Sequence, residues 1–454
     1  MFRLEDTICA PVTQPSKNSA ISIVRISGKD TLKIFSKIAI PTPPYEHRKM
    51  ILGKIFEPKT KKLIDNVQWV YYRKPKSYTG EDMIEIFTHG GLIIPEILIK
   101  ILLENGARFA EPGEFTLRAV LNGKMDMLSA QAINQIVKSE NLKALEISLK
   151  RLEGQLTKKF EEIFEKIKNI LARIEVNLNY PEEDLPPFSY EEIIDELKKI
   201  VKKIKNYLKE SEISKKIFEG IKISICGAPN VGKSTLFNRF LKKERAIVSE
   251  IPGTTRDYLG EYINIKGINA LIYDTAGLRV KPSSKIEKEG IKRAEKIIKE
   301  SHLIIWMFDA FKKPKKEELK KIRQLKERKK VILVINKIDK GLKWKKDIVK
   351  NLNDNIFEIS ALKGYGIEKL RKEIEKISES EMGSAEISLT LFEESKLKEV
   401  IRNLKEGIKL LKEKKEEISS IFLKQALYTL NIILGKDINE EILSKIFSDF
   451  CVGK

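Results

Sequence analysis

The spacing of hydrophobic residues divides this chain into segments of different character. Short β-branched runs at 21–26 and 67–72 predict strands, and the apolar stretch 93–103 predicts a buried helix. Further on, apolar residues recur every three or four positions from Leu149 to Ile174, which predicts one long amphipathic helix. The same spacing across 193–208 predicts a second helix, so this part of the chain is expected to form a helical bundle.

A third pattern begins near residue 217, where short hydrophobic runs alternate with helical segments. The runs predict strands at 221–225, 270–273, 303–308, 331–335 and 357–359. Such alternation is typical of a doubly wound α/β domain with a largely parallel sheet.

Helical spacing returns after a Ser/Glu/Gly-rich stretch at 378–384, which is read as a linker. Helical segments on both sides of one α/β unit predict that this unit is inserted into a helical bundle, because insertion allows both apolar stripes to be buried together. The predicted fold class is multidomain, α+β and α/β. The predicted domains are an N-terminal α+β domain (1–120), the first part of a helical domain (121–215), an inserted α/β domain (216–380) and the second part of the helical domain (381–454).

Composition narrows the class of protein. The 454 residues are 42% hydrophobic and 33% charged, which excludes a disordered chain and a membrane-embedded one, and no apolar stretch approaches the ~20 residues of a membrane span. Three cysteines are too few for a disulfide framework or a cysteine-based zinc site, so a cytoplasmic location is expected. The formal charge of +21 fits a nucleic-acid partner, but Lys–Glu runs on solvated helix faces would produce it too, and composition leaves both explanations open.

Residues 227–234 carry the clearest chemical signal. They read GAPNVGKS, which matches the phosphate-binding pattern G-x-x-x-x-G-K-[ST] between a predicted strand and a predicted helix. The glycines let backbone N–H groups surround a phosphate at the helix N-terminus. Lys233 is expected to reach the β- and γ-phosphates, and the Ser234 hydroxyl is expected to bind Mg²⁺.

The base is indicated by residues that follow two later strands. Asp339, in the sequence Asn336-Lys337-Ile338-Asp339, offers a carboxylate to guanine N1–H and the 2-amino group together. Adenine lacks both donors, so it would leave this carboxylate unpaired. GTP is therefore favoured over ATP, with Ser360, Ala361 and Leu362 expected near guanine O6.

The hydrolytic machinery is less completely specified. The tetrapeptide 274–277 (Asp-Thr-Ala-Gly) is expected to sense Mg²⁺ and the γ-phosphate, but Leu278 stands where many GTPases use a glutamine to orient water. One candidate helper is Glu287. Another is a monovalent cation held by Asn230 and the loop 253–257, and within that loop Arg256 is a competing candidate as an arginine finger.

These motifs together resemble the Era-like GTPases. Four further segments narrow the resemblance to the MnmE (TrmE) family of tRNA modification GTPases. They are 23–28 (IVRISG), 78–82 with 89–91 (YTGED and HGG), 112–126 (PGEFTLRAVLNGKMD) and 451–454 (CVGK).

The resemblance implies a GTPase that forms a homodimer through its N-terminal domain. That domain would bind 5-formyl- or 5,10-methylene-tetrahydrofolate through Arg25, Glu85, Lys124 and Lys454. With an FAD- and NADH-using partner of the MnmG (GidA) type, in a heterotetramer, it would modify C5 of the wobble uridine at position 34 of certain tRNAs. The product would carry an aminomethyl or carboxymethylaminomethyl group. The alternative is an Era-like switch in ribosome assembly, which would need an appended RNA-binding module that the sequence after 384 does not show.

The resemblance also implies a ligand set for the nucleotide site. Mg²⁺ would be bound by Ser234 and Thr255, and K⁺ by Asn230, Ser249, Ile251 and Thr254. The expected nucleotide-site residues are Asn230, Val231, Gly232, Lys233, Ser234, Thr235, Ser249, Thr254, Thr255, Asp274, Thr275, Ala276, Gly277, Asn336, Lys337, Asp339, Ser360, Ala361 and Leu362. The expected catalytic residues are Lys233, Glu287 and Cys451.

Three features are less clear from the sequence. Cys451 is a nucleophile or thiol shuttle under the resemblance and a packed or exposed thiol otherwise. His89 is interpreted as a structural histidine. Residues 13–20 lack glycine where the family usually has a Gly/Arg-rich turn, so the shape of that turn is not predicted.

Overall fold

The computed structural model describes most of the chain as two compact units. The described residues are 5–179, 189–244, 260–265, 268–274, 297–352, 356–382, 385–437, 440–448 and 450–454. The first unit comprises Met1–Lys138, Ser148–Asn206 and Leu389–Lys454, and the second comprises Ser139–Ile147 and Tyr207–Ser388. Most of the second unit is therefore inserted in the sequence of the first, as predicted, while the exact domain boundaries stay a prediction.

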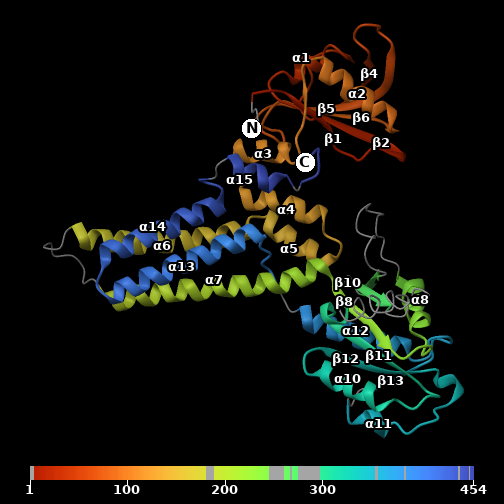
Figure 1. Ribbon diagram of the computed structural model, residues 1–454. Coiled ribbons are helices and arrows are strands. Elements are labelled where there is room, and N and C mark those ends of the chain that lie inside the picture. The colour runs from red at the N-terminus through yellow and green to blue at the C-terminus, as the bar shows by residue number, and fades with distance from the viewer. Residues whose placement is uncertain are drawn as a thin grey trace, which may run out of the picture. The chain divides into compact units, whose positions relative to one another are not determined.

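The N-terminal part of the first unit is built on a mixed sheet. Its strands, in the order β3-β4-β5-β6-β2-β1-β7 among the described residues, are β3 (Ala39–Ile40), β4 (Met50–Phe56), β5 (Leu63–Tyr72), β6 (Met83–Gly91), β2 (Ser16–Ser27), β1 (Ile8–Pro11) and β7 (Arg108–Phe109). The short helix α1 (Thr31–Phe35) and α2 (Ile93–Glu104) contribute Phe35 and Leu98 to the core that lies on this sheet (Figure 1). Because side chains alternate along a strand, Val24 and Ile26 point into this core and Arg25 between them faces the other side.

The rest of the first unit is helical. Its helices are α3 (Glu114–Leu121), α4 (Met127–Val137), α5 (Leu142–Leu152), α6 (Gln155–Asn179), α7 (Tyr190–Glu219), α13 (Leu391–Lys412), α14 (Glu416–Leu434) and α15 (Glu440–Phe447). The long helices α6, α7, α13 and α14 form the bundle visible in Figure 1. Two of these helices extend across both units. Residues 142–147 of α5 and residues 207–219 of α7 belong to the second unit, and the rest of each helix belongs to the first.

The single helix predicted across 149–174 is wrong in one respect. The helix is interrupted at residues 153–154, between the end of α5 and the start of α6. Gly154 has φ +77°, a left-handed conformation that ends a helix at little cost only for glycine. The hydrophobic spacing continues from Leu152 to Leu156 across the break, which is why it was not apparent from the pattern.

The second unit is the predicted doubly wound α/β fold. Its strands, in the order β13-β12-β11-β8-β10-β9 among the described residues, are β13 (Ile356–Ile359), β12 (Lys330–Asn336), β11 (Leu303–Asp309), β8 (Ile221–Gly227), β10 (Ile268–Asp274) and β9 (Gly260–Ile265). The helices that accompany it are α8 (Lys233–Glu244), α10 (Lys316–Lys326), α11 (Asp347–Lys350) and α12 (Ile367–Met382), with a 3₁₀ turn at Ile338–Lys340. All neighbouring strands are parallel except β9, which pairs antiparallel with β10.

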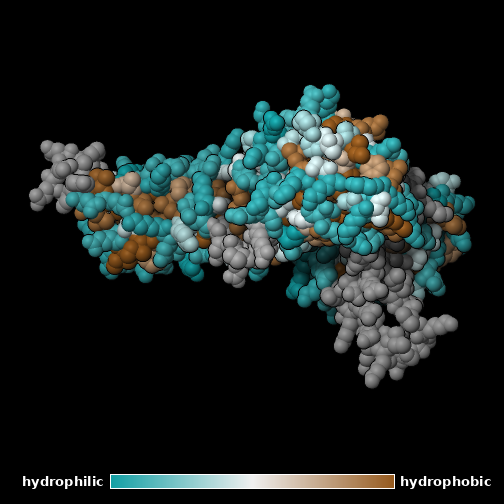
Figure 2. Space-filling model, turned by 90° about the horizontal axis from the view of Figure 1, so that it is seen from above, coloured by the Kyte–Doolittle hydropathy of each residue, from teal (hydrophilic) through white to brown (hydrophobic). Residues whose placement is uncertain are grey.

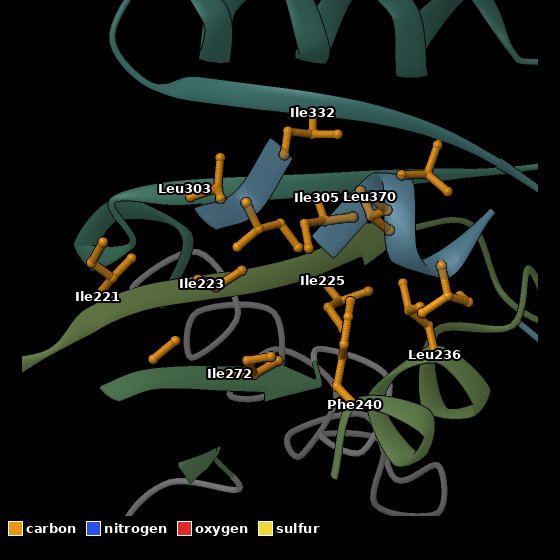
Figure 3. Packing of buried hydrophobic residues seen from close by; sticks show 14 of the residues in the cluster. Ile221, Ile223, Ile225, Leu236, Phe240, Ile272, Leu303, Ile305, Ile332 and Leu370 are labelled. Atoms are coloured by element: carbon orange, nitrogen blue, oxygen red, sulfur yellow. The ribbon is translucent and has the colours of Figure 1, made fainter. Parts of the chain in front are cut away.

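Both faces of this sheet are buried, which explains why its strands are continuously hydrophobic. Along β11, Leu303, Ile305 and Met307 pack into one core with Leu236 and Ile223 (Figure 3). The alternate residues Ile304, Trp306 and Phe308 pack into a second core on the opposite face. A parallel sheet covered on both sides requires apolar residues at every position, and this pattern distinguishes it from the half-exposed strands of the first unit.

Several local predictions are corrected or completed. Residues 378–382 were predicted to belong to a linker at 378–384, but they form the end of α12, which continues to Met382, and Ser378 is buried. The strand β9 and the helix α15 were not anticipated. In the glycine-free segment 13–20, β2 already begins at Ser16 and the Thr13 hydroxyl accepts a hydrogen bond from the Ile23 N–H, so a side chain closes this turn.

Hydrophilic residues cover most of the face of the molecule seen in Figure 2, with hydrophobic residues in smaller patches. Among the described residues, no helix is long and apolar enough to cross a membrane.

Candidate functional site

The phosphate-binding loop connects β8 to α8 and is shaped by its glycines. Gly227 has φ +141° and Gly232 has φ +99°. A Cβ on Gly227 would lie 2.3 Å from the Met307 carbonyl oxygen, and one on Gly232 would lie 2.2 Å from the Asn336 side-chain nitrogen. Only glycine fits at these two positions, so the backbone can curve closely around a bound phosphate.

Lys233 and Ser234 occupy the first turn of α8, at the end of the helix that attracts anions. The Lys233 ammonium group is mostly buried and donates to the carbonyl oxygens of Gly227 (2.9 Å) and Ala228 (2.8 Å), which hold it over the loop. Ser234 and Thr235 are exposed. This arrangement fits the predicted roles of Lys233 toward phosphate oxygens and of Ser234 toward Mg²⁺.

Asn336 joins the phosphate loop to the predicted base-binding loop. It is buried at the end of β12, and its amide donates to the Val231 carbonyl oxygen at 2.7 Å. Its side-chain oxygen accepts from the Ala361 N–H at 2.9 Å. One side chain thereby fixes two loops that are 130 residues apart in the chain, since it makes both hydrogen bonds at once.

Lys337 adds a second connection to the phosphate loop. The residue has φ +69°, and its ammonium group donates to the Asn230 carbonyl oxygen and to Asp309, both at 2.7 Å. Burial raises the pKa of Asp309, but the Lys337 hydrogen bond and the Phe311 N–H outweigh it, so the pKa lies below its usual value. Asp309 is therefore ionised at neutral pH and holds Lys337 in place.

Asp339 and the loop 360–362 lie at the same edge of the sheet. A hydrogen bond with the Ser360 side chain holds the pKa of the exposed Asp339 carboxyl below its usual value. Ser360 and Ala361 are buried, and Arg239 of α8 donates to the carbonyl oxygens of Ala361 (2.8 Å) and Leu362 (2.6 Å). An ionised carboxylate beside a loop held by Asn336 and Arg239 suits recognition of the donor edge of guanine.

Other predicted nucleotide-site residues lie outside the described residues. Asp274 is the last residue of β10, next to Ile225 of β8, but nothing is described of its side chain. The residues that lie outside are Ser249, Ile251, Thr254, Thr255, Arg256, Thr275, Ala276, Gly277 and Glu287. Their roles stay predictions.

A second cluster of functional candidates lies in the first unit around Arg25. This side chain is mostly buried and makes a forked contact with Glu85, through Nε at 3.0 Å and Nη2 at 2.6 Å. Its Nη1 donates to the carbonyl oxygen of Gly453 at 3.2 Å, and its guanidinium lies over the rings of Tyr78 and Phe115. A buried cation, a carboxylate and aromatic faces thus meet at one place.

The C-terminal residues are fitted tightly against this cluster. Gly453 is buried with φ +96°, and a Cβ there would lie 2.4 Å from the Pro11 carbonyl oxygen. Glu85 accepts a further hydrogen bond from the Tyr72 hydroxyl at 3.2 Å. Arg25, Glu85 and the segment before Lys454 are therefore together, as predicted.

Lys124 lies near the same motif but in contact with a different residue. Its Cγ is close to Gly80, where a Cβ would meet it at 3.4 Å, and Asn122 donates to the Thr79 carbonyl oxygen at 2.7 Å. The segment 122–124 is thus bound to the loop that carries Tyr78. Within the described part of the chain, no hydrogen bond or salt bridge joins Lys124 to Arg25.

Comparison with known proteins shows the family of this chain. The sequence model of the GTP-binding protein TrmE N-terminus matches residues 7–124, and that of the MnmE helical domain matches residues 127–451. The tRNA modification GTPase MnmE of Thermotoga maritima is 40% identical over 455 residues, covering 99% of this chain and 100% of that protein. The chain belongs to the MnmE family of tRNA modification GTPases. The MnmE of Aquifex aeolicus is 38% identical over 447 residues, covering 98% of both chains.

Solved structures with similarity include Era in complex with MgGDPNP and a segment of 16S ribosomal RNA. It has 31% sequence identity and a TM-score of 0.26, and the match covers 35% of this chain and 56% of that chain. As a member of the MnmE family, the chain is a GTP hydrolase with the P-loop fold that its sequence predicted.

Within this MnmE-family chain, the remaining candidates are placed as follows. Cys451 is exposed, and its carbonyl oxygen accepts from the Gly113 N–H at 3.4 Å and from the Lys454 N–H at 3.2 Å. A catalytic role for its thiol stays a prediction. The His89 ring is hydrogen-bonded to Asp65 at 2.7 Å, and the same carboxylate accepts from the His89 N–H, which fits the structural interpretation.

Sequence reasoning missed several side chains that hold the MnmE sites together. Arg239 lies on α8 with no motif around it, and Asp309 is one of several acids that end a strand. Tyr78 and Phe115 stood within recognised motifs, but only the structure brings them against Arg25. For Asp309, the strand order of a doubly wound sheet could have served as a signal. That order places the ends of β11 and β12 beside the phosphate loop.

Proposed function

We propose that this chain is a K⁺-stimulated GTPase that, with an FAD-dependent partner of the MnmG type, modifies C5 of the wobble uridine of certain tRNAs. The one-carbon unit comes from 5-formyl- or 5,10-methylene-tetrahydrofolate, and the product carries an aminomethyl or carboxymethylaminomethyl group. The protein acts as a homodimer that forms a heterotetramer with its partner, and tRNA is its substrate.

The observation that carries the proposal is the cluster of Arg25, Glu85 and Gly453 in a chain that also has a complete guanine-nucleotide motif set. Folate has an anionic glutamate tail and a pterin edge with N–H donors. Arg25 and Lys454 supply positive charge for the tail, while the Glu85 carboxylate can accept from the pterin edge. The aromatic rings of Tyr78 and Phe115 offer faces for a flat heterocycle.

In the nucleotide site, the residues of this chain bind the phosphates and orient the attacking water. The phosphate loop and Lys233 bind the phosphates, and Ser234 with Thr255 would hold Mg²⁺, which would neutralise charge on the phosphate oxygens. Asn230, Ser249, Ile251 and Thr254 would hold K⁺, which would supply the positive charge that an arginine finger supplies in other GTPases. Glu287 orients the attacking water, because Leu278, which stands where many GTPases have a glutamine, has no polar group for this role.

The alternative of a ribosome-assembly switch loses support from the comparisons. The similarity extends over 99% of the chain, including both parts that flank the GTPase unit, and the relatives are named tRNA modification GTPases.

The decisive experiment is nucleoside analysis of tRNA from a strain that lacks this gene. The C5-modified uridine should disappear and return with the natural gene but not with a Lys233→Ala variant. Unchanged nucleosides in the deletion strain would contradict the proposed function.

The folate site is tested by calorimetry with 5-formyl-tetrahydrofolate. The natural protein should bind and Arg25→Ala should not, while Arg73→Ala, which removes an exposed cation of the same domain, should bind normally. Thermal unfolding checks that Arg25→Ala stays folded. Absence of heat with the natural protein would leave the tRNA reaction intact but remove folate as its one-carbon source.

A further inference from the structure

A groove of about 350 Å³ on the helical bundle has an unusual lining. It runs between α7 and α13, and two apolar side chains form its floor while four lysines form its walls. The lining residues are Lys198, Val201, Lys202, Lys205, Lys405 and Ile408. No carboxylate lines it within the described part of the chain.

The lysines belong to two rows with helical spacing. On α13, basic residues stand at 398, 402, 405, 409 and 412, separated by three or four positions, so they share one face of the helix. On α7, Lys198, Lys202 and Lys205 are spaced in the same way. We call these eight residues the basic stripe, and all of them are exposed: Lys198, Lys202, Lys205, Lys398, Arg402, Lys405, Lys409 and Lys412.

Few of these charges are neutralised by an ion pair. Lys198 pairs with Asp195 at 2.8 Å, and the described structure shows no salt bridge for the other seven. The acids next to this row in the sequence are Glu399, Glu406 and Glu413, of which Glu399 pairs with Lys396 and Glu413 with Lys415.

The groove on the other side of α7 provides a contrast. It lies between α6 and α7, it includes Glu196 in its lining, and its Lys203 is paired with Glu162 at 3.0 Å. There three lysines line the groove together with one glutamate, and one of the lysines is paired across the two helices. The α7–α13 groove differs because its described lining holds four lysines and no acid.

We propose that the basic stripe binds the phosphate backbone of the substrate tRNA. This proposal rests on the proposed function. It assigns a binding surface to tRNA, because the other two sites are assigned to GTP and folate. The row on α13 spans 15 residues, from Lys398 to Lys412, or about 21 Å of helix. A duplex strand presents a phosphate about every 3 Å along its axis, so the stripe faces several phosphates at once.

The side chains around the stripe favour RNA over an anionic membrane. Between 398 and 412, every exposed side chain of α13 is charged, and the exposed side chains of α7 from 198 to 206 are lysines and one asparagine. A helix that enters a lipid surface needs exposed Trp, Phe or Leu beside its cations. The floor residues Val201 and Ile408 are mostly buried and cannot serve that purpose.

The test compares tRNA binding by the full-length protein and a triple variant, Lys202→Gln, Lys205→Gln and Lys405→Gln. An unmodified tRNA transcript and fluorescence anisotropy at several salt concentrations give both Kd and its salt dependence. We expect Kd to rise about 10- to 100-fold. The slope of log K against log salt should fall in magnitude by about 2 to 3, because binding with three fewer phosphate contacts releases fewer counterions. GTP turnover without tRNA should be unchanged, which also shows that the variant is folded.

Matched variants separate the stripe from general charge. Lys33→Gln with Lys37→Gln and Lys100→Gln removes three exposed lysines of the N-terminal domain and should leave Kd within about twofold. Arginine at 202, 205 and 405 should preserve binding. Equal binding by the stripe variant and the natural protein would overturn the proposal and leave the proposed function standing, whereas no tRNA binding by the natural protein would overturn both. Stripe-dependent binding to phosphatidylserine vesicles, with no change in tRNA affinity, would assign the stripe to a membrane instead.

Discussion

At the scale of single residues, the nucleotide site depends on side chains that hold loops together. Asn336 connects the phosphate loop to the loop 360–362, and Lys337 connects it to Asp309. The motif residues that bear chemistry were readable from sequence because their types and spacing are constrained by the ligand. Arg239 and Tyr78 were not, since their role depends on which elements the fold brings beside them.

Asp339→Asn should change the base preference. Guanine N1–H and the 2-amino group would then meet an amide donor in place of a carboxylate acceptor, so GTP affinity should fall by about 10²- to 10⁴-fold. Xanthosine triphosphate, which has a carbonyl at C2, should bind better than GTP. Nucleotide titrations of this variant and of the control Asp347→Asn, an exposed acid of the same unit, check it; equal GTP affinity in all three proteins would mean that the base site lies elsewhere.

The three cysteines should differ sharply in reactivity. Cys9 and Cys226 are buried, and burial raises the pKa of the Cys9 thiol to about 12, so it remains protonated and unreactive from pH 7 to pH 9. Cys451 is exposed. Iodoacetamide followed by peptide mass spectrometry should find fast labelling at Cys451 alone in the folded protein. Labelling of Cys9 at a comparable rate would contradict the packing of the N-terminal sheet.

At the scale of elements, hydrophobic spacing located most helices and strands but not their ends. The break at Gly154 was hidden because the apolar spacing continues across it. The helix α12 continues through Ser378 because its apolar residues Ile374 and Ile377 pack on the core of the second unit, which outweighs the low helix propensity of serine. The edge strand β9 contains Gly260, Glu261 and Asn264 and pairs on one side only, so it lacks the continuous apolar run that revealed its neighbours.

The start of α13 offers a prediction at this scale. Thr390 and Glu393 form a capping box, and Glu393 also accepts from Arg151 of α5 at 2.5 Å, with both side chains buried. Arg151 donates in addition to the Leu128 carbonyl oxygen and to Gln131 of α4. This ion pair therefore joins α4, α5 and α13.

Glu393→Ala should destabilise the helical part by about 3–5 kcal/mol, because it removes the carboxylate that pairs with the buried Arg151 at 2.5 Å. Thr390→Ala removes only a cap and should cost about 1 kcal/mol. Amide hydrogen exchange in α13, measured for both variants, reports this local stability. Similar exchange rates in the two variants would show that the ion pair contributes little beyond the cap.

At the scale of the whole molecule, the insertion was predictable because two apolar helical segments flank one α/β unit. The proximity of Gly453 to Arg25 was not predictable from local patterns, since it joins opposite ends of the chain. The burial of both faces of the second sheet follows from its continuously apolar strands, whereas the grouping of the N-terminal and helical parts in one compact unit does not. The loops that carry the remaining expected GTP ligands lie outside the described residues.

GTP turnover should depend on the monovalent cation. Replacing K⁺ by Na⁺ at constant ionic strength should lower the rate about tenfold or more, because under the proposed function K⁺ supplies the charge that an arginine finger supplies in other GTPases. Asn230→Ala should be slow in both salts, while the exposed Asn351→Ala should behave like the natural protein. Equal rates of the natural protein in K⁺ and Na⁺ would favour Arg256 as the catalytic cation.

The hydrogen bond from Arg25 to Gly453 also sets an order of events during synthesis. Its two ends are 428 residues apart in the chain. At the usual 5–20 residues per second, a ribosome needs roughly 20 to 90 s to produce Gly453 after Arg25. For that interval the nascent N-terminal sheet lacks this hydrogen bond, so the cluster around Arg25 is completed only after Gly453 has been synthesised.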